Sequence, residues 1–132
     1  MDVTSQLGPF AAGLKYADLP ADVRERCRMC FLDAVGVMLG AADFAKRNGD
    51  RCLETYLKAT APPGNATFLG YGIQTTPLMA AFANGTLSEV LDCQDSHWGS
   101  LAHSGTPGIP TALALAETNA LTWGDFVPAI IA

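Results

Sequence analysis

Between Pro20 and Met38 the sequence carries apolar side chains at spacings of three and four residues. This spacing is the period of an α-helix and predicts a long helix with one buried face, and Pro20 suits its first turn. The buried row consists of Val23, Cys27, Cys30, Phe31, Ala34, Val35 and Met38. After Met29 the segment is apolar on all sides apart from Asp33, which is typical of a helix inside a protein. We therefore expect Asp33 to be a structural carboxylate with a hydrogen-bond partner.

Five more segments show helical patterns, and together they predict an all-α fold, a bundle of about six helices. They cover roughly residues 4–16, 44–60 with a weak point at Gly49, 77–91, 107–120, and 123 onward. Residues 66–69 read as a short extended piece, and we expect no sheet. Thr122 and Asp125 have the spacing of a capping box at the start of the last helix. Because that helix is still apolar at Ala132, we expect the bundle to be incomplete at its C-terminus.

The positive charges are confined to the first part of the chain. All eight Lys and Arg lie in residues 1–58, whereas residues 59–132 contain five acidic residues and no Lys or Arg. A free surface normally mixes both signs, so this stretch is expected to be largely covered. The lack of a basic patch argues against a nucleic-acid partner.

The targeting and cysteine patterns predict a protein of the reducing cytoplasm. The N-terminus lacks the basic region of a signal peptide, and no apolar run is long enough to span a membrane. Cys27 and Cys30 have the spacing of half a zinc site, but the second cysteine pair is missing. We expect them to be core cysteines, which behave as small buried hydrophobes.

The segment 92–106 is the place where chemistry is concentrated. It holds both histidines of the chain, His97 and His103, together with Asp92, Asp95 and Ser96. Four interpretations stay open on residue types alone. They are a metal site without a standard ligand spacing, a Ser–His–Asp triad, general acid–base catalysis by an imidazole that titrates near neutral pH, and a solvated loop that caps helix ends.

Several motifs around this segment resemble the MmgE/PrpD family. The most specific are ANGTL (83–87), LDCQDSH (91–97), AHSG (102–105) and PTALALAE (110–117), and earlier ones are FAAGL (10–14), LP (19–20), FLDAVGV (31–37) and ATFLG (66–70). The family includes 2-methylcitrate dehydratase, cis-aconitate decarboxylase and related isomerases. The resemblance implies that residues 1–132 are the N-terminal portion of a large all-helical domain. The rest of that domain and a smaller α+β domain would lie outside this chain.

The resemblance also implies a chemistry and a set of site residues. It implies a lyase or isomerase that usually forms homodimers, acts on small di- or tricarboxylates and needs no metal or organic cofactor. It assigns His103 as the acid or base, Asp92 as its orienting or substrate-binding partner, and Ser96, Asp95 and His97 as substrate-binding residues. Ser104 and Gln94 depart from the family pattern, which has a proline and an acid there.

Because the family's lysines come from later in the chain, we expect these 132 residues alone to show no turnover. We also expect association through exposed apolar surface. The alternatives are a non-catalytic helical interaction module and a metal-dependent hydrolase that uses the Asp and His side chains of the loop.

Overall fold

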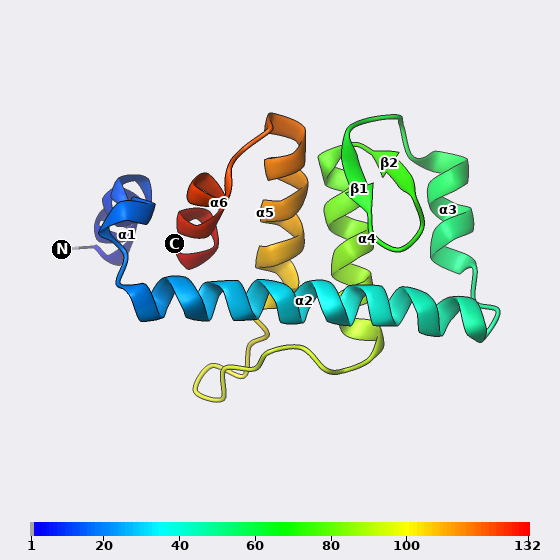
Figure 1. Cartoon of the computed structure of the whole chain (residues 1–132), viewed down its shortest axis with the longest axis horizontal. Coiled ribbons are helices and arrows are strands. Elements are labelled where there is room, and N and C mark those ends of the chain that lie inside the picture. Colours follow the sequence, from blue (N-terminus) through cyan, green and yellow to red (C-terminus); the bar gives the residue numbers. More distant parts are fainter. Residues whose placement is uncertain (1) are drawn as a thin grey trace.

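The computed structural model describes residues 2–132, which form six α-helices, one short 3₁₀ helix and a two-stranded sheet (Figure 1). The helices are α1 (Val3–Gly13), α2 (Ala21–Arg47), α3 (Cys52–Thr60), α4 (Pro77–Val90), α5 (Gly105–Asn119) and α6 (Trp123–Ile131), with the 3₁₀ helix η1 (Tyr16–Asp18). The strands are β1 (Ala66–Phe68) and β2 (Ile73–Thr75). The predicted fold class, a predominantly helical bundle, is confirmed.

The longest element, α2, runs along one side of the molecule, and α4, α5 and α6 all pack against it (Figure 1). Its 27 residues make it about 40 Å long. Every member of the predicted apolar row is buried or half-buried, with Cys27 and Met38 buried most deeply. The period of the sequence therefore identified the inner face correctly.

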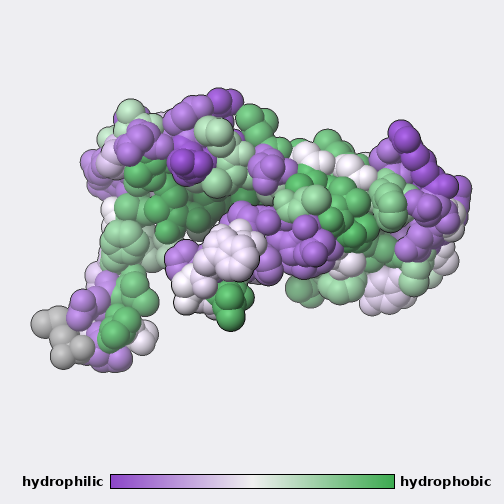
Figure 2. Space-filling view, turned by 90° about the horizontal axis from the view of Figure 1, so that it is seen from below, coloured by the Kyte–Doolittle hydropathy of each residue, from purple (hydrophilic) through white to green (hydrophobic). Residues whose placement is uncertain are grey.

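The prediction that the second half of α2 is buried on all sides is wrong. Met29, Leu32 and Leu39 are each roughly half exposed, and Asp33 is exposed as well. The helices that pack on α2, chiefly α4, α5 and α6, bury its apolar row and leave these side chains uncovered. Figure 2 looks at the molecule from the α2 side, and hydrophobic patches cover much of that face. This exposed apolar surface is the kind that drives association.

The predicted helix over residues 44–60 is also wrong, because the chain breaks there into two helices. The first helix, α2, continues to Arg47, and α3 begins at Cys52. Gly49 lies between them with φ of +72°, a left-handed conformation that glycine adopts at little cost. The Asp50 carboxylate then accepts a hydrogen bond from the Cys52 backbone N–H at 2.9 Å, which fixes the start of α3.

The expectation that the chain forms no sheet is wrong as well. β1 and β2 pair as an antiparallel hairpin, with Ala66 opposite Thr75 and Phe68 opposite Ile73. The turn requires Gly70, which has φ of +77° and lies so close to the Ala42 side chain that a Cβ atom would collide with it. Strands of three residues are too short to show the alternation by which a strand is recognised in a sequence.

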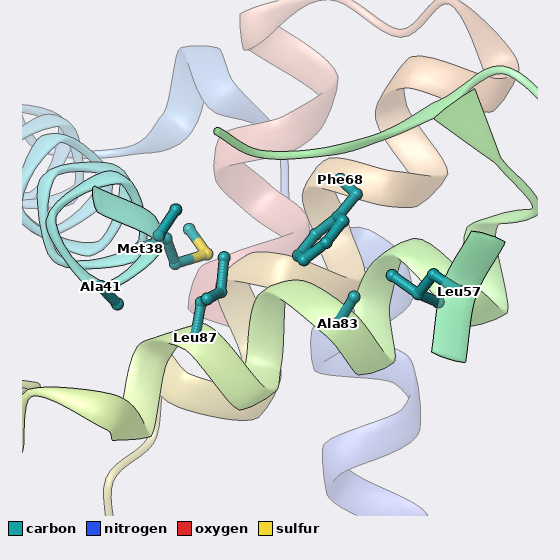
Figure 3. Close-up of a cluster of buried hydrophobic side chains, with 7 residues drawn as sticks. Met38, Ala41, Leu57, Phe68, Ala83 and Leu87 are labelled. Atoms are coloured by element: carbon teal, nitrogen blue, oxygen red, sulfur yellow. The ribbon is translucent and has the colours of Figure 1, made fainter. Parts of the chain in front are cut away.

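The core consists of two main clusters that share α2. One cluster surrounds the hairpin, where Phe68 points from β1 toward Ala83 on α4 (Figure 3). It comprises Met38, Ala41, Ala42, Leu57, Phe68, Ala83 and Leu87. The other cluster joins the first half of α2 to α5 and α6 and comprises Leu19, Cys27, Ile109, Phe126 and Val127.

Two polar side chains hold the hairpin to the helices beneath it. Asn84 of α4 accepts a hydrogen bond from the Leu69 N–H at 3.0 Å and donates one to the Thr67 carbonyl at 2.8 Å. Glu117 of α5 accepts bonds from the N–H and the hydroxyl of Thr67 at 2.7 and 2.8 Å. Both residues belong to the motifs described above, so those motifs have a structural role in addition to any chemical one.

The predicted capping signal at α6 is confirmed. The Asp125 carboxylate accepts hydrogen bonds from the hydroxyl of Thr122 at 2.6 Å and from its backbone N–H at 2.9 Å. These bonds stabilise the charged form and lower the pKa of Asp125.

The cysteines do not all share one environment. Cys27 is buried, and burial raises the pKa of its thiol, whereas Cys30 is half-buried and Cys52 and Cys93 are exposed. All four are free thiols. The core role predicted for the first pair is thus confirmed for Cys27. Across residues 2–132, no helix combines the length and the apolar character needed to cross a lipid bilayer.

Candidate functional site

The loop between α4 and α5 crosses to the side of α2 opposite the hairpin (Figure 1). Its tip is closed by a bridge in which the His97 N–H donates to the Ala102 carbonyl at 2.8 Å. Trp98 and Leu101 project from that tip and are 86% and 83% exposed. The loop is therefore locally ordered by its own hydrogen bonds while most of its side chains face solvent.

His103 is held at one ring nitrogen. Its Nδ1 atom lies 2.8 Å from the backbone carbonyl of Asp95 and 3.2 Å from the hydroxyl of Ser96. A carbonyl can only accept a hydrogen bond, so Nδ1 must carry the proton. In the neutral imidazole the lone pair is then on Nε2, and this atom can take a proton from a ligand.

The Asp95 carboxylate is used to fix the start of α5. Its two oxygens lie 3.0 and 3.3 Å from the N–H of Gly105, the first residue of that helix. A carboxylate at this position is stabilised by the positive end of the helix dipole. A side chain at Gly105 would collide with the Asp95 carboxylate, so the close approach depends on glycine. Asp95 therefore contacts His103 through its backbone carbonyl and the start of α5 through its carboxylate.

Asp92 is placed differently. It has a positive φ of 52° just after α4 and is exposed. Within residues 2–132 its carboxylate forms no hydrogen bond, and it is Asp95 and Ser96 that contact His103. The role of Asp92 as an orienting or substrate-binding residue stays a prediction.

His97 is engaged within its own turn. Its Nδ1 atom lies 2.8 Å from the Ser100 hydroxyl and accepts the Ser100 backbone N–H at 3.2 Å. Since a backbone N–H only donates, the neutral ring must carry its proton on Nε2. The two histidines of the loop therefore present opposite tautomers, and only His103 offers a free Nε2 lone pair.

This geometry does not match two of the interpretations that the sequence left open. In a catalytic triad the serine and the carboxylate contact opposite nitrogens of the imidazole. Here Ser96 and the Asp95 carbonyl meet the same nitrogen, and the Asp95 carboxylate is bound to Gly105. The described part of the chain also contains no cluster of three or more His, Cys, Asp or Glu side chains suited to a metal ion.

A pocket of about 460 Å³ lies beside the loop, between α2, the first turns of α5, and α6. Its polar lining is Asp22, Arg26, Asp95 and Ser104, and the other lining residues are Val23, Cys27, Cys30, Gly105, Gly108, Ile109, Ile130 and Ile131. The pocket thus reaches the residue that follows His103 and the residue that holds it.

Sequence reasoning missed Arg26. Residues 59–132 contain no Lys or Arg, so the sequence placed no positive charge beside the loop, but the fold brings Arg26 from α2 into the pocket next to it. The available signal was its register, because Arg26 is three residues from Val23 and four from Cys30, both of which line the pocket. Among the ion pairs of residues 2–132, none involves Arg26.

Comparison with known proteins decides the family. The sequence profile of the MmgE/PrpD N-terminal domain matches residues 5–132. The chain belongs to the MmgE/PrpD family. The resemblance drawn from the motifs is therefore confirmed, and the match extends through the loop and the three helices after the hairpin.

Within the MmgE/PrpD family the chain is similar to fungal proteins. It is 30% identical to a cis-aconitate decarboxylase of Aspergillus terreus over 121 residues, which cover 89% of this chain and 24% of that protein. It is 27% identical over 119 residues to the cis-aconitate decarboxylase-like protein oryM of Aspergillus oryzae, with the same coverage. The chain thus spans about a quarter of the length of these relatives. No solved structure matches it significantly.

Proposed function

We propose that this chain supplies the histidine-bearing part of a lyase or isomerase that acts on small di- or tricarboxylates by general acid–base chemistry, without a cofactor. The observation that carries the proposal is the fixed tautomer of His103, whose Nδ1 is held by the Asp95 carbonyl at 2.8 Å. The similarity to cis-aconitate decarboxylases of Aspergillus supports the substrate class. A homodimer and a cytoplasmic location, both implied at the sequence level, belong to the same proposal.

In the proposed reaction Nε2 of His103 removes a proton from a carbon next to a substrate carboxylate. The electron pair of the broken C–H bond moves toward that carboxylate, and in a dehydration it then expels hydroxide from the neighbouring carbon. In a decarboxylation no C–H bond breaks: the C–C bond to the leaving carboxylate breaks, CO₂ departs, and the electron pair left on the carbon framework takes a proton from Nε2 of His103 in its protonated imidazolium form. Ser96 would donate a hydrogen bond to a substrate oxygen, and Asp92, Asp95 and His97 lie in the same loop.

Arg26 is expected to hold a substrate carboxylate. A charge-assisted hydrogen bond is worth about 1.5–3 kcal/mol, so Arg26→Gln should raise KM for the carboxylate substrate by about 10- to 100-fold and change kcat much less. Steady-state kinetics of the full-length gene product measure both constants. Arg28→Gln is the matched control, because Arg28 is paired with Glu25 at 2.6 Å and does not line the pocket. Equal effects of the two substitutions would exclude a specific role for Arg26.

The proposed function is tested by incubating the full-length gene product with cis-aconitate and with 2-methylcitrate in D₂O. We expect ¹H NMR to show consumption of a substrate and deuterium at a carbon next to a carboxylate. The rate should be the same with and without EDTA, and the 132-residue chain alone should show no turnover. A folded protein that neither consumes nor exchanges any di- or tricarboxylate would overturn the proposal. Activity that EDTA abolishes and a metal restores would favour the metal-dependent hydrolase.

A further inference from the structure

A small cavity of about 40 Å³ lies behind the Asp95–His103 contact, between α2, α4, the loop and the first turn of α5. Two buried polar atoms belong to residues that line it, the side-chain oxygens of Gln94 and Thr106. Neither oxygen has a hydrogen-bond partner among the protein groups of residues 2–132. Buried polar atoms in native proteins are almost always paired with protein or with ordered water.

The chemistry of the lining selects the ligand. The Gln94 amide nitrogen donates to the Glu89 carboxylate at 2.9 Å, so the atom left in the cavity is the carbonyl oxygen Oε1, which can only accept. Asp33 and Asp95 also line the cavity, and their negative charges disfavour an anion, so the ligand is a neutral group that can donate a hydrogen bond to Gln94 Oε1. About 10–15 Å³ of cavity space is enough to hold a water molecule, which also needs two to four polar partners. The volume and the partners are therefore sufficient for at least one water.

We propose that a water molecule binds in this cavity, donates to Gln94 Oε1 and accepts from the Thr106 hydroxyl, and that Thr106 is thereby a positioning residue for His103. Its second hydrogen is free to donate to Asp33, an exposed residue of α2 that also lines the cavity.

The water sits where it would influence the imidazole. Gln94 directly precedes Asp95, whose carbonyl accepts from His103 Nδ1, and Thr106 directly follows Gly105, whose N–H binds the Asp95 carboxylate. The water therefore links Gln94, which precedes Asp95 in the loop, to Thr106 in the first turn of α5. The binding of the water stands on the cavity alone, whereas its effect on catalysis rests on the proposed function.

The test compares Thr106→Val, which keeps the shape of the side chain, with Thr106→Ser, which keeps the hydroxyl. One hydrogen bond is worth about three- to tenfold, so we expect the valine variant to lose about that factor in kcat with little change in KM. The serine variant should stay within about twofold of the parent. The same pair of substitutions at Thr111, an exposed residue of α5 that donates to the Pro107 carbonyl, is the matched control. If Thr106 acts only by packing, valine will be tolerated and serine will be the damaging substitution, and the proposal fails.

Two measurements test for the water without depending on enzymatic turnover. A high-resolution crystal structure should show a water within hydrogen-bond distance of both oxygens in the parent protein and in the serine variant. In ¹⁵N NMR spectra the Nδ1–H signal of His103 should be protected in both of these proteins and weakened in the valine variant. An empty cavity, or one filled by a rearranged side chain, would overturn the proposal. If no protein turns over a carboxylate, the proposed function fails while these readouts still decide the water.

Discussion

His103→Asn is expected to lower kcat for the carboxylate substrate by about 10²- to 10⁴-fold, the usual contribution of a positioned acid or base. The asparagine amide can take the place of Nδ1–H and still donate to the Asp95 carbonyl, which His103 contacts at 2.8 Å. It has no counterpart of Nε2. The variant therefore removes the proposed base while leaving the contact that shapes the loop, and its melting temperature should stay close to that of the parent protein.

Two comparisons sharpen this result. His97→Asn removes the other imidazole of the loop, whose Nδ1 is bound to Ser100, and we expect a smaller loss of kcat than at position 103. Stopped-assay kinetics and thermal unfolding of both variants provide the data. A His103→Asn protein that retains most of its kcat would exclude His103 as the acid or base. A larger loss at His97 would move the assignment to that residue.

Asn84→Ala is expected to lower the free energy of unfolding by about 2–4 kcal/mol, because two buried backbone groups lose their partners at about 1–3 kcal/mol each. These groups are the Leu69 N–H and the Thr67 carbonyl of the hairpin, and Asn84 itself is fully buried. Urea denaturation followed by circular dichroism measures the change.

The matched control for this prediction is Asn119→Ala. Asn119 is exposed, and among residues 2–132 its amide donates only to the Leu115 carbonyl within α5, so we expect a change within about 0.5 kcal/mol. Asn84→Asp offers a second check, since it keeps the acceptor for Leu69 but loses the donor to Thr67. If Asn84→Ala is no more destabilising than the control, the hairpin does not depend on this clamp.

The sequence predicted the helices well where a period runs over many residues. The apolar row of α2 runs from Val23 to Met38, so the helical period can be recognised even if one residue departs from it. The break at Gly49 and the three-residue strands around Gly70 were missed because each depends on one or two backbone dihedrals. The exposure of one side of α2 was missed because an apolar composition favours burial of a surface and does not show which element would cover it.

For the site, the sequence located the loop and both histidines but could not say what holds them. His103 is fixed by the backbone carbonyl of Asp95, and every residue has such a carbonyl, so no side-chain pattern marks it. Asp92 and Asp95 have the same side chain and lie three residues apart in one irregular segment. Only the fold shows that Asp95 caps α5, and only the fold brings Arg26 beside the loop.

The shared helix α2 has a consequence for how the molecule loses its structure. The first half of α2 is buried by α5 and α6, and the second half by α3, α4 and the hairpin. Each half is about as short as the shortest helix that survives alone in water, roughly 12–15 residues. If one cluster opens, the half of α2 that it covered frays and withdraws support from the other half. We therefore expect the two clusters to melt as one cooperative unit.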